Sequence, residues 1–193
     1  MTYQIISDST CDLSPEQVKK YNIHLMPLYV QLGDKTFRDG VDIHPDDIYA
    51  HVAAGGDLAA TAAVNLADYV QVFSEYSRKA DFVIHVTISS DFSCCYQNAK
   101  LAAADFDNVY VVDSRNLSTG HGLVVLEAER MAREGMAPDD IVAETVCSRY
   151  MEAFDGKNID ALIMGCTHYP VYRPALEKRL PGVRMIDVGE ALA

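Results

Sequence analysis

A cysteine and a histidine two residues apart form the first group in the sequence that could carry chemistry. They lie in the hexapeptide Gly-Cys-Thr-His-Tyr-Pro at residues 165–170, directly after an apolar run that is typical of a strand. Glycine before Cys166 lets a substrate approach closely, and His168 can adjust the pKa of the thiol. These residue types fit a thiol acid or base. The alternative is an ordinary core thiol, because free cysteine is among the most buried residue types.

A second group consists of hydroxyl side chains at the predicted start of a helix. Residues 89–93 read Ser-Ser-Asp-Phe-Ser, and they follow an apolar strand and lead into the helix through Cys94. Backbone N–H groups at a helix start, together with a hydroxyl, suit a carboxylate ligand. Thr61, in a run of small residues at 59–63, could face this loop from a neighbouring one. The alternative is that Ser93 serves only as a helix N-cap.

Alternating strand-like and helix-like segments must position both groups. Strands are predicted over 3–7, 82–88, 109–112, 159–165 and 183–187, and helices over 45–52, 66–79, 93–104, 122–134, 139–154 and 172–180. This alternation predicts an α/β fold with a doubly wound, mainly parallel sheet flanked by helices. A turn at residues 33–34 adds a small β-hairpin near residues 23–38, and Ser14 followed by proline marks a further helix start. Ligands of such sheets bind beyond the carboxyl ends of the strands, where both polar groups fall.

Composition limits the partners of this chain of 193 residues. Its net charge is −12, from 28 acidic and 16 basic residues, and such a field disfavours binding to nucleic acid or to anionic membranes. No run reaches the roughly 20 apolar residues of a membrane span, and the N-terminus lacks a basic signal segment. The five cysteines show no framework spacing, which predicts reduced thiols in a cytoplasmic protein. The six histidines show no zinc-ligand spacing, so no metal is expected.

Several ordered motifs over residues 1–155 resemble the N-terminal domain of the DegV family. They are Ile-Ser-Asp-Ser-Thr-Cys-Asp-Leu at 6–13, Met-Pro-Leu at 26–28, Phe-Arg-Asp-Gly-Val-Asp-Ile at 37–43, the serine-rich segment 88–99, Val-Val-Asp-Ser at 111–114, and Ser-Thr-Gly-His-Gly-Leu-Val-Val at 118–125. The resemblance implies a cofactor-free carrier that holds a long-chain fatty acid in a tunnel between two domains. It also implies a fatty acid kinase as partner, since the family presents bound acyl chains to such a kinase.

The same resemblance implies which residues bind the ligand. Thr61 and Ser93 match the threonine and the serine that hold the fatty acid carboxylate in the family. Two neighbouring residues depart from its usual pattern, since Ala62 stands in place of serine and Cys94 in place of glycine. An exposed tunnel face also predicts a homodimer, because large apolar patches rarely stay open to water.

The hexapeptide at 165–170 resembles a different family, the glutamate/aspartate racemases, at their second catalytic cysteine. This resemblance continues to Gly189 and implies an alternative function as a cofactor-independent amino-acid racemase. Cys166 would be the thiol acid or base, His168 its helper and Thr167 a ligand of the substrate carboxylate. Residues 156–193 would form a racemase-like βαβ extension of the sheet built by residues 1–155. A fragment of either family without activity is the remaining alternative.

Overall fold

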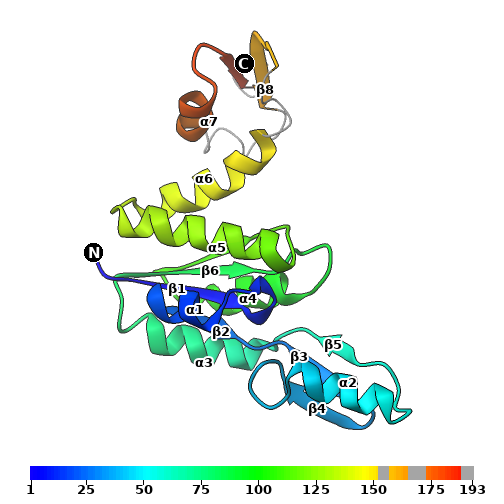
Figure 1. Cartoon of the computed structure of the whole chain (residues 1–193). Helices are drawn as coiled ribbons and strands as arrows, with labels where there is room; N and C mark the ends of the chain where they lie inside the picture. Colours follow the sequence, from blue (N-terminus) through cyan, green and yellow to red (C-terminus); the bar gives the residue numbers. More distant parts are fainter. Residues whose placement is uncertain (152–156, 165–172, 188–193) are drawn as a thin grey trace. The chain divides into compact units, whose positions relative to one another are not determined.

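The structure is a computed structural model that describes residues 1–151, 157–164 and 173–187 (Figure 1). The chain divides into two compact units, Met1–Pro138 and Asp139–Ala193. This boundary lies earlier than the one at residue 155 that the sequence motifs suggest. No helix among the described residues is long and apolar enough to cross a membrane.

A four-stranded parallel sheet forms the centre of the first unit. Its order is β2 (Ile23–Met26), β1 (Tyr3–Asp8), β6 (Phe82–Thr87) and β7 (Val109–Asp113). β6 is buried along its whole length, as expected for a central parallel strand covered on both faces. The chain adds β2 on one side of β1 and places β6 and β7 on the other. The carboxyl ends of β1 and β6 therefore form a topological switch point, where ligands bind in such sheets.

Helices cover both faces of this sheet, which confirms the predicted α/β fold. Figure 1 shows α5 (Ser118–Arg133) on one face and α3 (Leu66–Tyr76) on the other, where α3 packs against α4 (Cys95–Ala103). The core on the α3 face includes Tyr69 and Phe73 of α3, with Ile6 and Val83 of the sheet. These large apolar side chains recur at helical spacing on α3, so a single face of the helix is buried.

Two shorter helices complete the connections of the sheet. The 3₁₀ helix η1 (Ser9–Cys11) follows β1, and α1 (Pro15–Lys20) connects it to β2. The predicted start of α1 is confirmed, since the Ser14 hydroxyl accepts a hydrogen bond from the Gln17 N–H and the Gln17 side chain accepts one from the Ser14 N–H.

The predicted hairpin is present as part of a three-stranded antiparallel sheet. β3 (Tyr29–Leu32) and β4 (Lys35–Arg38) are joined by a two-residue turn in which Gly33 has a φ of 56°. β5 (Ala60–Ala62) pairs with β3 on the other side, and α2 (Pro45–Ala53) lies between β4 and β5 in the chain. The start of the predicted hairpin region, β2, belongs instead to the parallel sheet.

The second unit contains a smaller parallel pair of strands. Its described elements are α6 (Pro138–Met151), β8 (Ala161–Met164), α7 (Arg173–Arg179) and β9 (Arg184–Asp187). β8 pairs with β9, and Met164 and Leu176 form the centre of a small core. The prediction that residues 156–193 extend the sheet of the first unit stays a prediction. Met164 is the buried residue of β8, and it packs within the unit's own core.

Candidate functional site

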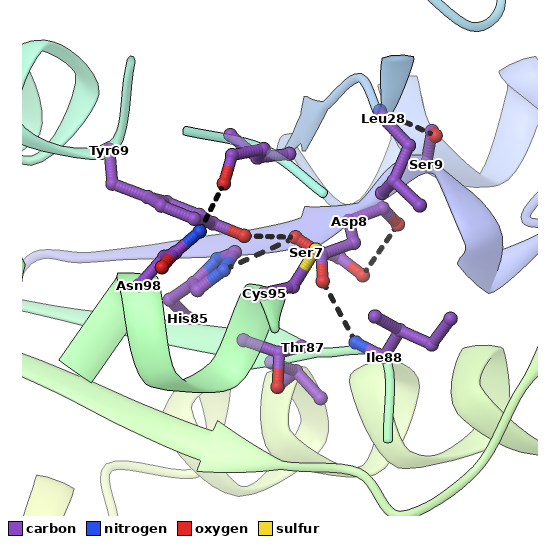
Figure 2. Close-up of polar contacts among 12 residues, drawn as sticks. Ser7, Asp8, Ser9, Leu28, Tyr69, His85, Thr87, Ile88, Cys95 and Asn98 are labelled. Atoms are coloured by element: carbon purple, nitrogen blue, oxygen red, sulfur yellow. Dashed lines mark hydrogen bonds and ion pairs between the residues drawn. The ribbon is translucent and has the colours of Figure 1, made fainter. Parts of the chain in front are cut away.

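A buried carboxylate lies at the switch point. Asp8 is the last residue of β1 and is fully buried. Its Oδ2 accepts a hydrogen bond from the Ile88 N–H at 2.8 Å, and its Oδ1 accepts one from the Tyr69 hydroxyl at 3.0 Å (Figure 2). Ile88 follows β6 and begins the serine-rich loop. Asp8 therefore fixes the start of this loop to the end of β1.

Aromatic rings enclose Asp8 on the α3 face of the sheet. The His85 ring packs edge-on against Tyr69 and Phe73, with centroid distances of 5.2 and 5.5 Å. Its Nε2 lies 3.4 Å from Asp8 Oδ1, too poorly aligned for a hydrogen bond, and neither ring nitrogen has a hydrogen-bond partner in the described part of the chain. Burial, reinforced by the charge of Asp8, raises the pKa of Tyr69. The Tyr69 hydroxyl therefore stays protonated and remains a donor to Asp8.

Ser93, the predicted ligand residue, is half-buried just before α4. Its Oγ accepts a hydrogen bond from the Cys95 N–H at 3.3 Å and donates one to Cys95 Sγ at 3.2 Å. The first bond satisfies a backbone N–H at the start of α4, but the N-cap residue of this helix is Cys94 rather than Ser93. The second uses the hydrogen that a ligand carboxylate would accept. Cys94, between the two, is exposed, whereas Cys95 is fully buried.

Thr61 lies on β5 rather than in the predicted loop. It is exposed and pairs with Val30 of β3, while Ala62 beside it is half-buried. The segment that follows reaches α4, because the Asn98 side chain donates a hydrogen bond to the Val64 carbonyl at 2.9 Å. No hydrogen bond joins Thr61 to Ser93 directly. Thr61 and Ser93 are therefore linked only indirectly, because the segment that follows β5 is hydrogen-bonded to α4, which follows Ser93.

The other side of the serine-rich loop is held by the end of β7. Asp113 accepts hydrogen bonds from the Ser90 hydroxyl at 2.6 Å and from the Ser90 N–H at 3.1 Å. Arg115 donates to Asp91 at 2.8 Å and to the Ser90 hydroxyl at 3.3 Å. Sequence reasoning missed this arginine, although its place two residues beyond a strand end is the signal that would have found it.

A buried histidine links α5 to the same edge of the sheet. His121 Nε2 lies 3.2 Å from both the Ser7 hydroxyl and the Val86 carbonyl, and Nδ1 lies 3.4 Å from the Thr10 hydroxyl. Burial is the main cause that lowers the pKa of His121. The ring is therefore neutral near pH 7 and acts as a structural link between β1, β6 and α5.

The residues of the alternative, racemase-like site cannot be placed in this way. Cys166, Thr167 and His168 lie outside the described residues, so their predicted roles stay predictions. Within the described ranges, no group of three or more histidine, cysteine, aspartate or glutamate residues is arranged to hold a metal ion.

The fold is an α/β domain with polar groups at its switch point, and comparison with known proteins gives its family. The family model described as uncharacterised protein, DegV family, matches residues 2–155. The chain belongs to the DegV family. A DegV domain-containing protein of Clostridium perfringens is 36 % identical over 143 residues, which are 73 % of this chain and 51 % of the relative.

Solved structures agree with this assignment. A DegV family protein from Thermus thermophilus, described as fatty acid binding, matches with a TM-score of 0.72 and 32 % identity over 78 % of this chain and 54 % of its own. A stearic acid-binding protein from Eubacterium ventriosum matches with a TM-score of 0.67 and 30 % identity over 75 % of this chain and 52 % of its own. The chain therefore spans about half the length of these relatives.

Proposed function

We propose that the protein binds a long-chain fatty acid as a carrier, and that the hydroxyls of Thr61 and Ser93 hold its carboxylate. The observation that supports this most is the hydrogen bond from Ser93 Oγ to the sulfur of Cys95. Sulfur is a weak acceptor, whereas a carboxylate forms short, charge-assisted hydrogen bonds. A carboxylate that reaches Ser93 would therefore take over this hydrogen at little cost. The two fatty-acid-binding relatives support the class of ligand.

The surroundings of Ser93 also suit an anion with an apolar tail. The site lies at the N-terminus of α4, where the helix dipole favours a negative charge even in a protein with a net charge of −12. Phe92, which precedes Ser93, is 68 % exposed and offers apolar surface to the first methylene groups. Each methylene group that is buried contributes about 0.8 kcal/mol. Ala62 and Cys94 are proposed to line the same site beside Thr61 and Ser93.

The partners and location of this carrier are proposed on separate grounds. A fatty acid kinase as partner, and a carrier rather than an enzyme, follow from the family resemblance. A homodimer is proposed because an uncovered acyl-binding face would be a large apolar patch. A cytoplasmic location is supported by Cys11, Cys94 and Cys95, which are free thiols and suit a reducing compartment.

Mass spectrometry of the lipid that co-purifies with the protein tests this function. The protein is purified from bacterial cells and extracted with organic solvent, and the fatty acids in the extract are quantified. We expect a near-stoichiometric fatty acid that is lost in Ser93→Ala. The matched control is Ser90→Ala in the same loop, because the Ser90 hydroxyl is committed to Asp113. An empty protein, or lipid retained by Ser93→Ala, contradicts the proposal.

A further inference from the structure

Three groups from different elements surround the thiol of Cys95. The Ser93 hydroxyl lies 3.2 Å from Sγ. The Val64 backbone and the Tyr69 side chain also hydrogen-bond to the thiol and oppose the rise in its pKa that burial, followed by the charge of Asp8, causes. Because burial dominates, the raised pKa keeps the group a neutral thiol at pH 7. Cys95 thus contacts the serine-rich loop, α3 and the segment that follows Thr61.

Tyr69 and Asp8, which lie next to Cys95, also hold the beginning of the serine-rich loop. Tyr69 donates its hydroxyl hydrogen to Asp8, whose other oxygen accepts the Ile88 N–H (Figure 2). The loop therefore starts on a direct bond to Asp8 and ends at Cys95, which contacts Asp8 through Tyr69. All three side chains are fully buried, so water does not compete for these hydrogen bonds.

We infer that Cys95, supported by Tyr69 and Asp8, positions the two hydroxyl-bearing segments for the ligand. The Cys95 N–H holds the Ser93 oxygen in place, and the contact of the Cys95 thiol with Val64 sets the spacing between Ser93 and the strand that carries Thr61. The Asn98 bond to the Val64 carbonyl fixes the same spacing from α4. This inference rests on the proposed function, because positioning has a consequence only where a carboxylate binds.

A double-mutant cycle on affinity distinguishes positioning from a general loss of structure. Binding of cis-parinaric acid is followed by fluorescence for the unmodified protein, Tyr69→Phe, Ser93→Ala and the double variant. Tyr69→Phe removes one hydroxyl and keeps the ring, and we expect about fivefold weaker binding, with about tenfold for Ser93→Ala. Because Tyr69 acts through Ser93, the double variant should bind no more weakly than about tenfold, rather than the product of about fiftyfold.

The control is Tyr76→Phe on the same helix, seven residues further on. Its hydroxyl is hydrogen-bonded to His24 at 3.0 Å, away from the serine-rich loop, so the affinity should change by less than about twofold. If Tyr69→Phe does not fold, Cys95→Ala replaces it in the same cycle. Two results would overturn this inference and leave the proposed function standing. One is a double variant whose loss of affinity equals the product of the two single losses, and the other is a Tyr69→Phe variant that binds as tightly as Tyr76→Phe. An unmodified protein that binds no cis-parinaric acid overturns the proposed function and this inference with it.

Discussion

Gly122 lies where α5 comes closest to η1, and a methyl group at this residue tests how tightly the two elements pack. A Cβ at residue 122 would lie 2.4 Å from the carbonyl oxygen of Cys11 and 3.2 Å from a methyl carbon of Leu13. The Cys11 carbonyl belongs to the backbone, so it cannot yield without a shift of η1. We therefore expect Gly122→Ala to lower the free energy of unfolding.

The size of this effect follows from two opposing contributions. Replacing glycine by alanine inside a helix stabilises it by about 1 kcal/mol. Forcing a methyl group into a closely packed contact costs about 1–3 kcal/mol. A separation of 2.4 Å from a backbone oxygen is far below van der Waals contact, so the cost falls at the upper end of that range. The net loss of stability should be about 1–2 kcal/mol.

Gly120→Ala provides the matched control on the same helix. A Cβ at Gly120 would lie 2.8 Å from Oδ1 of Asn116, but this atom is the end of a side chain that can rotate away. We expect Gly120→Ala to keep or raise the stability, by up to about 1 kcal/mol. Urea unfolding followed by circular dichroism measures both variants. Equal stability of Gly122→Ala and the unmodified protein, or equal effects of the two substitutions, would refute the close approach.

Three further predictions concern Asp8, the cap of α1 and the buried histidines. Asp8→Ala leaves two buried donors without a partner, at about 1–3 kcal/mol each, so urea unfolding should show a loss of about 2–6 kcal/mol, and a loss below about 1 kcal/mol would contradict its role. Ser14→Ala removes the helix cap and should cost about 1 kcal/mol in the same assay, with no loss as the contrary result. Burial lowers the pKa of His24 and of His121 in the folded protein. The unfolded chain therefore binds these protons more readily, so stability is full above about pH 6.5 and falls as the pH drops below it. Thermal melts at pH 7.5 and 5.5 should give a lower midpoint at 5.5, and equal midpoints would contradict this prediction.

The alternation of strands and helices could be predicted from the sequence because it depends on local patterns. The apolar run that became β6, the serine-proline start of α1 and the glycine turn between β3 and β4 each carry their own signal. β5 carried none, because an Ala-Thr-Ala stretch has little β-propensity and its pairing with β3 depends on distant residues. α5 begins at Ser118, four residues before the predicted start. Gly122 lies inside the helix, at the point where α5 closely approaches η1.

The location of the site could be predicted, but the hydrogen bonds that hold its residues could not. Parallel strands bring their carboxyl ends to one edge, so the sequence alone placed the polar residues after β1, β6 and β7 near one another. The bond between Asp8 and Tyr69 joins residues 61 positions apart, and that between Asp8 and Ile88 joins residues 80 apart. No local pattern indicates such pairs. The bond from Ser93 to Cys95 is local, but cysteine is seldom considered as an acceptor.

The carbon NMR signal of a labelled ligand tests the central claim most directly. The protein is mixed with oleic acid labelled with ¹³C at the carboxyl carbon, and the bound resonance is recorded for the unmodified protein and for Thr61→Val with Ser93→Ala. We predict a bound resonance that is distinct from that of free oleate, because two hydroxyls donate hydrogen bonds to the carboxylate, and its loss or return toward the free position in the double variant. A bound resonance that is the same in both proteins would contradict the claim that Thr61 and Ser93 hold the carboxylate.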